Sequence, residues 1–218
     1  MCYRCRRPSV TCLCSVINSF VSPISFAILQ HPAEAQNPIA TARMAKLSIE
    51  NSYLFVDQDF SQNSLVNELL KNDDHSHYML FPSPTALSLD SCFEEITTNP
   101  NKRPLFWVLD AKWKDVPKMI RLSSNIQKIP LVKFAPLVSS QFIIRKQPNS
   151  HCLSTIESIH LVIDSYCKKF NVSFQKHQGL LNVFNHLVQQ QIEFAKTHQN
   201  NRHQQNKKIR HEKKQKTD

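Results

Sequence analysis

Four of the seven cysteines lie within the first fourteen residues, in the stretch MCYRCRRPSVTCLC. Cys2 and Cys5 are separated by two residues, and Cys12 and Cys14 by one. Thiolates at such spacings reach one tetrahedral Zn²⁺ with Zn–S distances of ~2.3 Å, and two pairs complete a shell of four sulfur ligands. Unrelated cysteines or a redox C-x-x-C pair are the alternatives, but a thioredoxin-type pair begins a helix after a strand. The spacing therefore predicts a structural zinc site, whose closed shell leaves no coordination position for chemistry.

Asp110 is a second candidate for chemistry. It ends the run PLFWVLD, which is the clearest buried strand in the sequence. Open α/β sheets present functional groups at the carboxyl ends of their strands. Aspartate also commonly caps the helix that follows it, and its position alone favours capping. Asp110 therefore becomes a catalytic candidate only where a further pattern supports it.

Glycine content and charge restrict the class of function. Gly179 is the single glycine, so a P-loop, a dinucleotide-binding motif and a kinase glycine-rich loop are excluded. The net charge of +10 and the pI of about 9.4 favour a polyanionic partner, nucleic acid before an anionic membrane surface. Residues 202–218 hold seven Lys or Arg and two acidic residues, a net of 7 − 2 = +5. Half of the excess charge therefore lies at the end of the chain.

The start of the chain lacks the apolar run of a signal peptide, and no stretch reaches the ~18 apolar residues of a membrane span. We therefore expect a cytoplasmic protein that has no membrane partner and shows no sign of an obligate protein partner. In a reducing compartment a cysteine cluster is typical of a metal site rather than of disulfides. The remaining cysteines are expected in the core: Cys92, Cys152 and Cys167.

Apolar runs of strand length alternate with runs of helical period along the chain. Strands are predicted at residues 24–29, 51–56, 77–81, 104–110, 129–134 and 141–145. Helices are predicted from residue 38 for about three turns and over residues 64–72, 112–122, 153–170 and 179–196. This alternation predicts an α/β fold with a mostly parallel sheet flanked by helices.

Three segments are expected. Residues 1–20 form the four-cysteine zinc knuckle, and residues 21–198 form the main domain. Residues 199–218 lack apolar periodicity and form a disordered basic tail or a helix extension that frays into one. This tail either serves solubility or tethers the protein to RNA or DNA through counterion release.

Five pieces of the sequence occur in the order that is typical of one family. They are C-x-R-C…C-x-C, HPAE, FPS, LDAKW and FIIRKQPNSHCLSTIES, and they extend from Cys2 to about Tyr166. In these pieces the chain resembles the DTW-domain family of tRNA-uridine aminocarboxypropyltransferases, which is related to the SPOUT-like knotted transferases. The resemblance implies a SPOUT-like knotted fold, in which crossing loops rather than glycine turns hold an adenosyl group.

The resemblance also implies a reaction. S-adenosylmethionine would donate its 3-amino-3-carboxypropyl group to N3 of a uridine in tRNA, and methylthioadenosine would be released. The variable loop of the tRNA is the preferred target, before the D-loop. Asp110 and His31 would be catalytic, with Asp110 taking the N3 proton or aligning the ammonium group of the donor. His31 would contact the substrate or relay a proton, or would only bond the backbone at the end of its strand.

Binding residues follow from the same match. The implied donor-binding residues are Phe81, Pro82, Ser83, Leu109, Asp110, Ser154, Thr155 and Glu157. Backbone N–H groups at the start of the late helix would receive the carboxylate of the donor, or an ordinary capping box would use them. The implied RNA-binding residues are Lys112, Trp113, Arg145 and Lys146. Trp113 would stack on a flipped base, or would pack in the core.

One position departs from the family motif. A hydroxyl-bearing residue is expected between the aspartate and the tryptophan, and Lys112 stands there instead. If Lys112 does not take over the role of the hydroxyl group, activity is reduced or redirected. Two alternatives therefore stand beside the transferase: a non-catalytic RNA-binding module on the same fold, and a SPOUT-like RNA methyltransferase. Neither the modified uridine nor the oligomeric state follows from the sequence.

Overall fold

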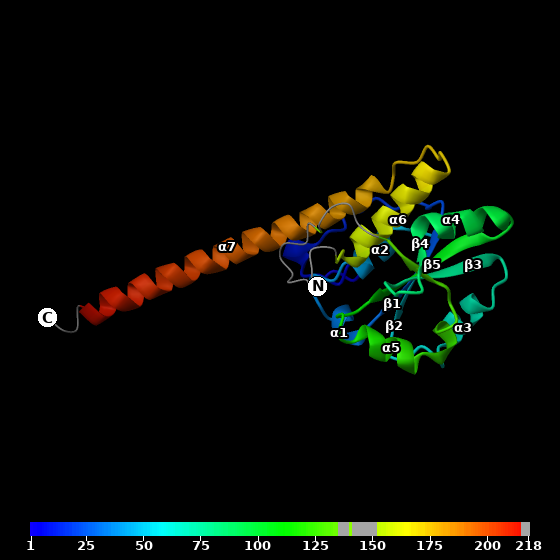
Figure 1. Ribbon diagram of the computed structural model, residues 1–218. Coiled ribbons are helices and arrows are strands. Elements are labelled where there is room, and N and C mark those ends of the chain that lie inside the picture. The colour runs from blue at the N-terminus through cyan, green and yellow to red at the C-terminus, as the bar shows by residue number, and fades with distance from the viewer. Residues whose placement is uncertain (135–139, 141–151, 215–218) are drawn as a thin grey trace.

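A parallel β-sheet forms the centre of the protein (Figure 1). The computed structural model describes residues 1–134, 140 and 152–214, with side chains as far as Thr197. Six strands lie in the order β2-β1-β5-β3-β6-β4, and all neighbouring strands are parallel. The strands are β1 (Ser25–Gln30), β2 (Ser52–Val56), β3 (His75–Leu80), β4 (Leu87–Ser88), β5 (Arg103–Asp110) and β6 (Leu131–Lys133). The α/β class and the parallel sheet predicted from the sequence are confirmed, and the knot stays a prediction.

Helices cover both faces of the sheet because alternate side chains of each strand point to opposite faces. Phe106 and Val108 of β5 pack in one core with α2, α4, α6 and α7, while Leu105 and Trp107 pack in the other with α3 and α5 (Figure 1). The helices are α1 (Pro32–Ala35), α2 (Ala42–Ser48), α3 (Ser64–Leu70), α4 (Leu89–Thr98), α5 (Val116–Leu122), α6 (Thr155–Lys169) and α7 (Gln178–Lys214). Short 3₁₀ turns occur at Ser9–Thr11 and Ser124–Ile126.

Several helices differ from the sequence prediction. Helix α1 was not predicted, and α5 begins at Val116 rather than at residue 112. The helix expected from residue 38 begins only at Ala42, because Asn37 forms a turn in which its side-chain oxygen accepts from the N–H of Ile39. Helix α4 was not predicted. Its apolar residues nevertheless follow a helical spacing, and Ser88 caps it by accepting from the N–H of Ser91 at 3.0 Å. The helical spacing of apolar residues was therefore present in the sequence, but polar residues interrupt it.

The last helix is long. Helix α7 continues to Lys214, so residues 199–214 are helical, as in the second of the two alternatives for the tail. It projects from the domain in Figure 1. None of the helices in the described part of the chain combines the length and the apolar composition of a membrane span. The strand predicted at residues 141–145 lies outside the described residues.

Turns that usually need glycine are made by other residues. Arg6 and Asn171 adopt positive φ angles of 54° and 51°. For a residue with a Cβ, this left-handed conformation is unfavourable by roughly 1 kcal/mol. Gly179 lies in α7 instead and does not have a positive φ.

Candidate functional site

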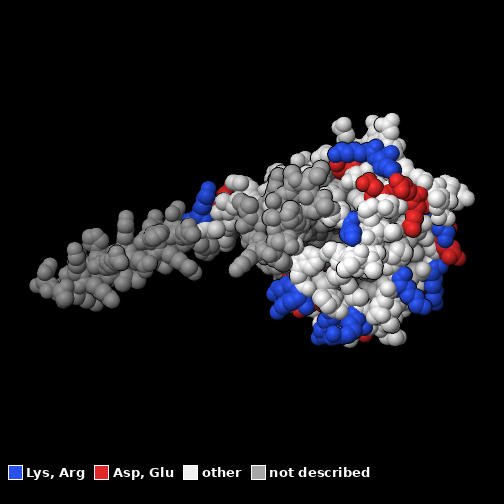
Figure 2. All heavy atoms as spheres, viewed as in Figure 1, with Lys and Arg blue, Asp and Glu red and all other residues white. Residues whose placement is uncertain are grey.

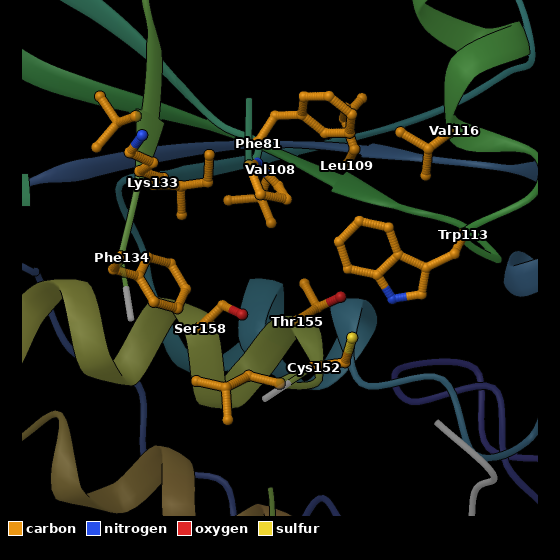
Figure 3. Close-up of a pocket in the computed structure, with 14 residues that line it drawn as sticks. Phe81, Val108, Leu109, Trp113, Val116, Lys133, Phe134, Cys152, Thr155 and Ser158 are labelled. Carbon is orange, nitrogen blue, oxygen red and sulfur yellow. The ribbon is translucent and has the colours of Figure 1, made fainter. Parts of the chain in front are cut away.

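A pocket of about 480 Å³ lies at the carboxyl ends of β3, β5 and β6, beside the start of α6 (Figure 3). Its walls are mostly apolar, with Leu80 from β3, Val108 from β5 and Val132 from β6. Thr155 and Ser158 extend from α6 toward these strands. A pocket of this size with a few polar groups suits a small organic ligand.

The rim of the pocket combines an aromatic ring and a cation. Trp113 lies on one side and Lys133 on the other (Figure 3). The side chain of Trp113 is 44% exposed, so the alternative that it packs in the core is wrong. Lys133 Nζ donates to the carbonyl oxygen of Ser83 at 3.4 Å, and this contact joins the loop after β3 to β6. The role of Trp113 in RNA binding stays a prediction.

Asp110 lies beside this pocket and is only 6% exposed. Its Oδ2 accepts a hydrogen bond of 2.8 Å from Gln30 Nε2, and its Oδ1 accepts one of 2.5 Å from the hydroxyl group of Thr155. Thr155 lines the pocket, whereas Asp110 does not. The carboxylate is therefore connected to the pocket through the Thr155 hydroxyl group.

The register of the sheet explains this contact. Gln30 pairs with Asp110 across β1 and β5, so both side chains leave the last position of their strands at the same level. Even-numbered residues of these strands, such as Phe26 and Phe106, face the core that contains α6. Gln30 and Asp110 share that parity and therefore meet the first turn of α6. The network joins three elements that are distant in the sequence.

The start of α6 uses its polar groups internally. Glu157 is buried, and its Oε2 accepts from the backbone N–H of Ser154 at 2.8 Å and from the Ser154 hydroxyl group at 2.6 Å. The N–H of Ile156 donates to Thr41 Oγ1 at 3.4 Å. These bonds correspond to the capping alternative for Ser154 and Glu157. Donor binding by these two residues stays a prediction.

The other predicted pocket residues divide into two groups. Phe81, Pro82 and Leu109 line the pocket, as does Thr155. Ser83 is not among the described residues that line it, and its hydroxyl group instead lies 3.1 Å from that of Thr85.

His31 lies at the end of β1, outside the described lining of the pocket. Its Nδ1 accepts from the N–H of Ala33 at 3.2 Å, so it caps the short helix α1. Its Nε2 lies 3.3 Å from Gln58 Nε2. Backbone bonding at the end of the strand, the simpler of its two alternatives, is thus present, and a catalytic role stays a prediction.

Of the four predicted RNA-binding residues, Trp113 alone is among the described residues that line the pocket. Lys112 is exposed on the loop after β5, and it does not line the pocket. It therefore adds no polar group to the described lining of the pocket, and its role in RNA binding stays a prediction. Arg145 and Lys146 lie outside the described residues.

Sequence reasoning missed Gln30 as a site residue. Gln30 is 1% exposed, and its Oε1 has no hydrogen-bond partner in the described part of the protein. A signal was present, because glutamine is an unusual last residue for a fully buried strand. Several further pocket residues were also missed, namely Leu80, Val108, Val116, Val132, Phe134, Cys152, Leu153 and Ser158.

The four N-terminal cysteines come together as predicted. All four sulfur atoms lie within 4.8 Å of one another. Cys2 Sγ is 3.6 Å from Cys14 Sγ, and Cys5 Sγ is 3.7 Å from Cys12 Sγ. Four sulfurs at ~2.3 Å from a tetrahedral centre are about 3.8 Å apart, whereas a disulfide joins sulfurs at ~2.0 Å. The donor set and its dimensions therefore fit a four-coordinate metal ion.

The pKa values of the Cys2 and Cys14 thiols are shifted in opposite directions. The backbone groups of Cys5 and Arg4 lower the pKa of the Cys2 thiol to about 6. Burial, followed by hydrogen bonds from neighbouring thiols, raises the pKa of Cys14 to about 12. Four thiolates so close together need a cation to ionise at neutral pH, and a bound metal supplies it.

Arg7 connects this cluster to the rest of the domain. Its guanidinium is 3% exposed and donates to the carbonyl oxygens of Thr11, at 2.8 Å, and of Pro38. It also lies 3.4 Å from Gln190 Oε1 of α7. Burial lowers the pKa of Arg7, and the sulfurs of Cys5 and Cys12 act in the opposite direction.

On the face shown in Figure 2, the described Lys and Arg side chains lie in separate groups, with acidic groups between some of them.

Comparison with known proteins gives a consistent match. Residues 1–192 match the DTW domain. The chain is 28% identical over 162 residues to tRNA-uridine aminocarboxypropyltransferase 2 of Drosophila melanogaster and to the protein of that name from Mus musculus. These residues are 72% of the chain, and they cover 62% of the fly protein and 53% of the mouse protein.

The chain thus spans little more than half the length of these curated relatives. No solved protein structure gives a significant match. Because the family match covers most of the sequence, including the cysteine cluster and the Asp110 strand, the chain belongs to the DTW domain family.

Proposed function

We propose that the protein transfers the 3-amino-3-carboxypropyl group of S-adenosylmethionine to N3 of a uridine in tRNA. The observation that carries this proposal is the apolar pocket, with its Thr155 hydroxyl group held by Asp110. The names of the relatives support the reaction, since they are tRNA-uridine aminocarboxypropyltransferases. The variable loop is the preferred target, as the sequence resemblance implies.

The apolar lining suits the change of charge in this reaction. The N3–C bond forms while the C–S bond breaks, and the electron pair of that bond passes to the sulfur. The sulfonium becomes the neutral thioether of methylthioadenosine, and the N3 proton passes to solvent water. Charge disappears as a partly anionic nitrogen meets a cation, so a site of low polarity favours the transition state over the separated ions.

Thr155 is the residue that we expect to touch the reactants. Its hydroxyl proton is directed to Asp110, so the lone pairs of its oxygen remain to accept from a donor group in the pocket. The ammonium group of the transferred arm or the N3–H of the uridine would supply that donor. Asp110 then serves as a positioning residue. The family motif has a hydroxyl-bearing residue at the position of Lys112, and Thr155 supplies a hydroxyl group close to that motif.

The cysteine cluster would hold Zn²⁺ through Cys2, Cys5, Cys12 and Cys14. The ion would act as a structural clamp, because four protein ligands leave no position for a substrate. The chemistry is therefore assigned to the pocket and not to the metal.

The direct test uses unmodified tRNA and S-adenosylmethionine that is labelled separately in the methyl and in the carboxypropyl group. We expect carboxypropyl label in the tRNA and one methylthioadenosine released for each group transferred. Methyl label in the tRNA would instead identify a methyltransferase. Retained tRNA binding without any label would identify a binding module.

Variants at Thr155 sharpen this test. Thr155→Val removes the hydroxyl group and keeps the shape, and we expect transfer to fall at least tenfold, as for other lost transition-state contacts. Thr155→Ser is the matched control and should retain most of the activity. Equal activity of the two variants would contradict a role for the hydroxyl group.

A further inference from the structure

The cysteine cluster carries an aromatic ring and two cations on its solvent side. The side chain of Tyr3 is 96% exposed, and Arg4 and Arg6 are also exposed. Within the described part of the protein, none of these three side chains takes part in a hydrogen bond, ion pair or ring contact. An aromatic ring so fully exposed to water gains nothing from its own fold.

The turn that carries these side chains is rigidly defined. The N–H of Cys2 donates to the carbonyl of Arg7 at 2.8 Å, and the N–H of Arg6 donates to the carbonyl of Cys2 at 2.9 Å. Arg6 has a φ of 54°, which is unfavourable for a residue with a side chain. Glycine would remove that strain, but it would also remove the cation. The backbone that carries Tyr3, Arg4 and Arg6 is therefore preorganised, which reduces the backbone entropy lost when a ligand binds.

A further cation lies next to this turn. Arg43 lies half-buried in α2, where burial lowers its pKa, the positive charge of Arg6 lowers it further and Cys5 acts in the opposite direction. From residue 1 to residue 49 the chain has one acidic residue, Glu34, which is buried. Four thiolates and a Zn²⁺ would carry a formal charge of −2, and the sulfur of Cys5 interacts with the buried guanidinium of Arg7 and with the half-buried one of Arg43.

Buried contacts link the cysteine cluster to the start of α6. Arg7 donates to the carbonyl of Pro38, in the loop that leads to α2. Thr41, just before α2, accepts from the N–H of Ile156 in the first turn of α6. The same turn of α6 contributes Thr155 to the pocket. The cysteine cluster and the pocket are therefore connected through two contacts and the first turn of α6.

We propose that Tyr3, Arg4, Arg6 and Arg43 form a docking platform for an unpaired nucleotide of RNA. The ring of Tyr3 stacks on the base, and the guanidinium groups bind the phosphates on either side of it. An exposed ring among cations without acidic partners suits a nucleotide better than an acidic peptide, which offers charge but no flat surface. The platform rests on the proposed function only in the choice of tRNA as its RNA.

Direct binding of the full-length, metal-loaded protein to a tRNA transcript tests the platform. We expect Tyr3→Ala to weaken binding about tenfold, which is the usual size of one lost stacking contact. Tyr3→Phe should bind normally because the ring is kept. Tyr53→Ala is the matched control, since Tyr53 is a 41%-exposed aromatic residue on the edge strand β2, and it should change binding less than twofold.

The cations are tested through salt dependence. Arg6→Gln and Arg43→Gln should each reduce the slope of log K against log salt by about one, as expected for one lost phosphate contact. Lys118→Gln, on the exposed side of α5, removes the same charge and should leave the slope unchanged. The metal content of each variant shows whether the cluster is intact.

The outcomes separate the platform from the transferase. Normal binding by Tyr3→Ala together with unchanged slopes for both arginine variants would overturn the platform, even if transfer proceeds. The expected losses of binding in a protein that transfers no label would overturn the proposed function and leave the platform standing. A fully paired RNA duplex should bind with no dependence on Tyr3, and an equal dependence would contradict stacking on an unpaired base.

Discussion

The cysteine cluster and the Asp110 network are both held by short polar contacts, but they are built from different ranges of the sequence. The cluster takes its four ligands from residues 2–14. In the network, Gln30 and Asp110 are 80 residues apart, and Asp110 and Thr155 are 45 residues apart. The cluster therefore depends on local spacing, and the network depends on strand order and register. The two regions should respond differently to perturbation.

Loss of the metal should have the largest effect. Cys5→Ser removes a ligand that is 2% exposed, and we expect it to release the metal and to lower the free energy of unfolding by several kcal/mol. Metal analysis and thermal unfolding measure the two changes. Cys167→Ser is the control, because Cys167 is buried in α6 and should affect packing without loss of metal. Full metal content in Cys5→Ser would contradict the role of Cys5 as a metal ligand.

Asp110→Asn should act on chemistry and leave the metal in place. The amide keeps the shape of the side chain, but it removes the charge that orients the Thr155 hydroxyl group. We expect kcat for transfer to fall about 10²-fold or more, within the range for lost electrostatic and acid–base contributions. Asp115→Asn is the matched control, on the loop before α5. Turnover near that of the unchanged protein would show that the network is only structural.

Arg7→Gln should weaken the link between the two regions. It removes buried, charged hydrogen bonds to the carbonyls of Thr11 and Pro38, so we expect the free energy of unfolding to fall by about 2 kcal/mol. Metal binding should persist, because Arg7 is not a ligand. Arg4→Gln is the control on an exposed neighbour and should change stability by less than about 0.5 kcal/mol. Denaturant titration distinguishes the two variants, and equal stabilities would contradict the linking role of Arg7.

Lys112→Thr should have the smallest effect. It restores the hydroxyl residue of the family motif at an exposed position outside the pocket. Because Thr155 already supplies a hydroxyl group to the pocket, we expect transfer to change less than about twofold, as for an ordinary surface substitution. Initial rates at saturating tRNA provide the measurement. A tenfold gain would show that the position of Lys112 reaches the reactants after all.

The sequence was most informative where the determinant is local. The spacing of Cys2, Cys5, Cys12 and Cys14 predicts the cluster, because short loops bring the sulfur atoms of each pair within reach of one ion. The cap of α6 was likewise foreseen as an alternative, since Ser154 and Glu157 lie one turn apart.

The Asp110 network could be predicted only in part. The apolar run of β5 indicates that Asp110 ends a strand, but not that β1 is the neighbour of β5 or that Gln30 lies at the same level. A register shift of one residue would turn Gln30 to the opposite face of the sheet. The pocket has the same limitation, because its walls come from three strands, α6 and the loop that carries Trp113.

The scarcity of glycine also affects the unfolded chain. Gly179 lies where an added Cβ would meet no atom within 4 Å, so the single glycine is not required by space. A chain with side chains at nearly every position has fewer backbone conformations open to it before it folds, and less conformational entropy is then lost on folding. The strain at Arg6 and Asn171, roughly 1 kcal/mol each, is a small opposing term. Part of the stability of this domain therefore comes from the low conformational entropy of its unfolded chain.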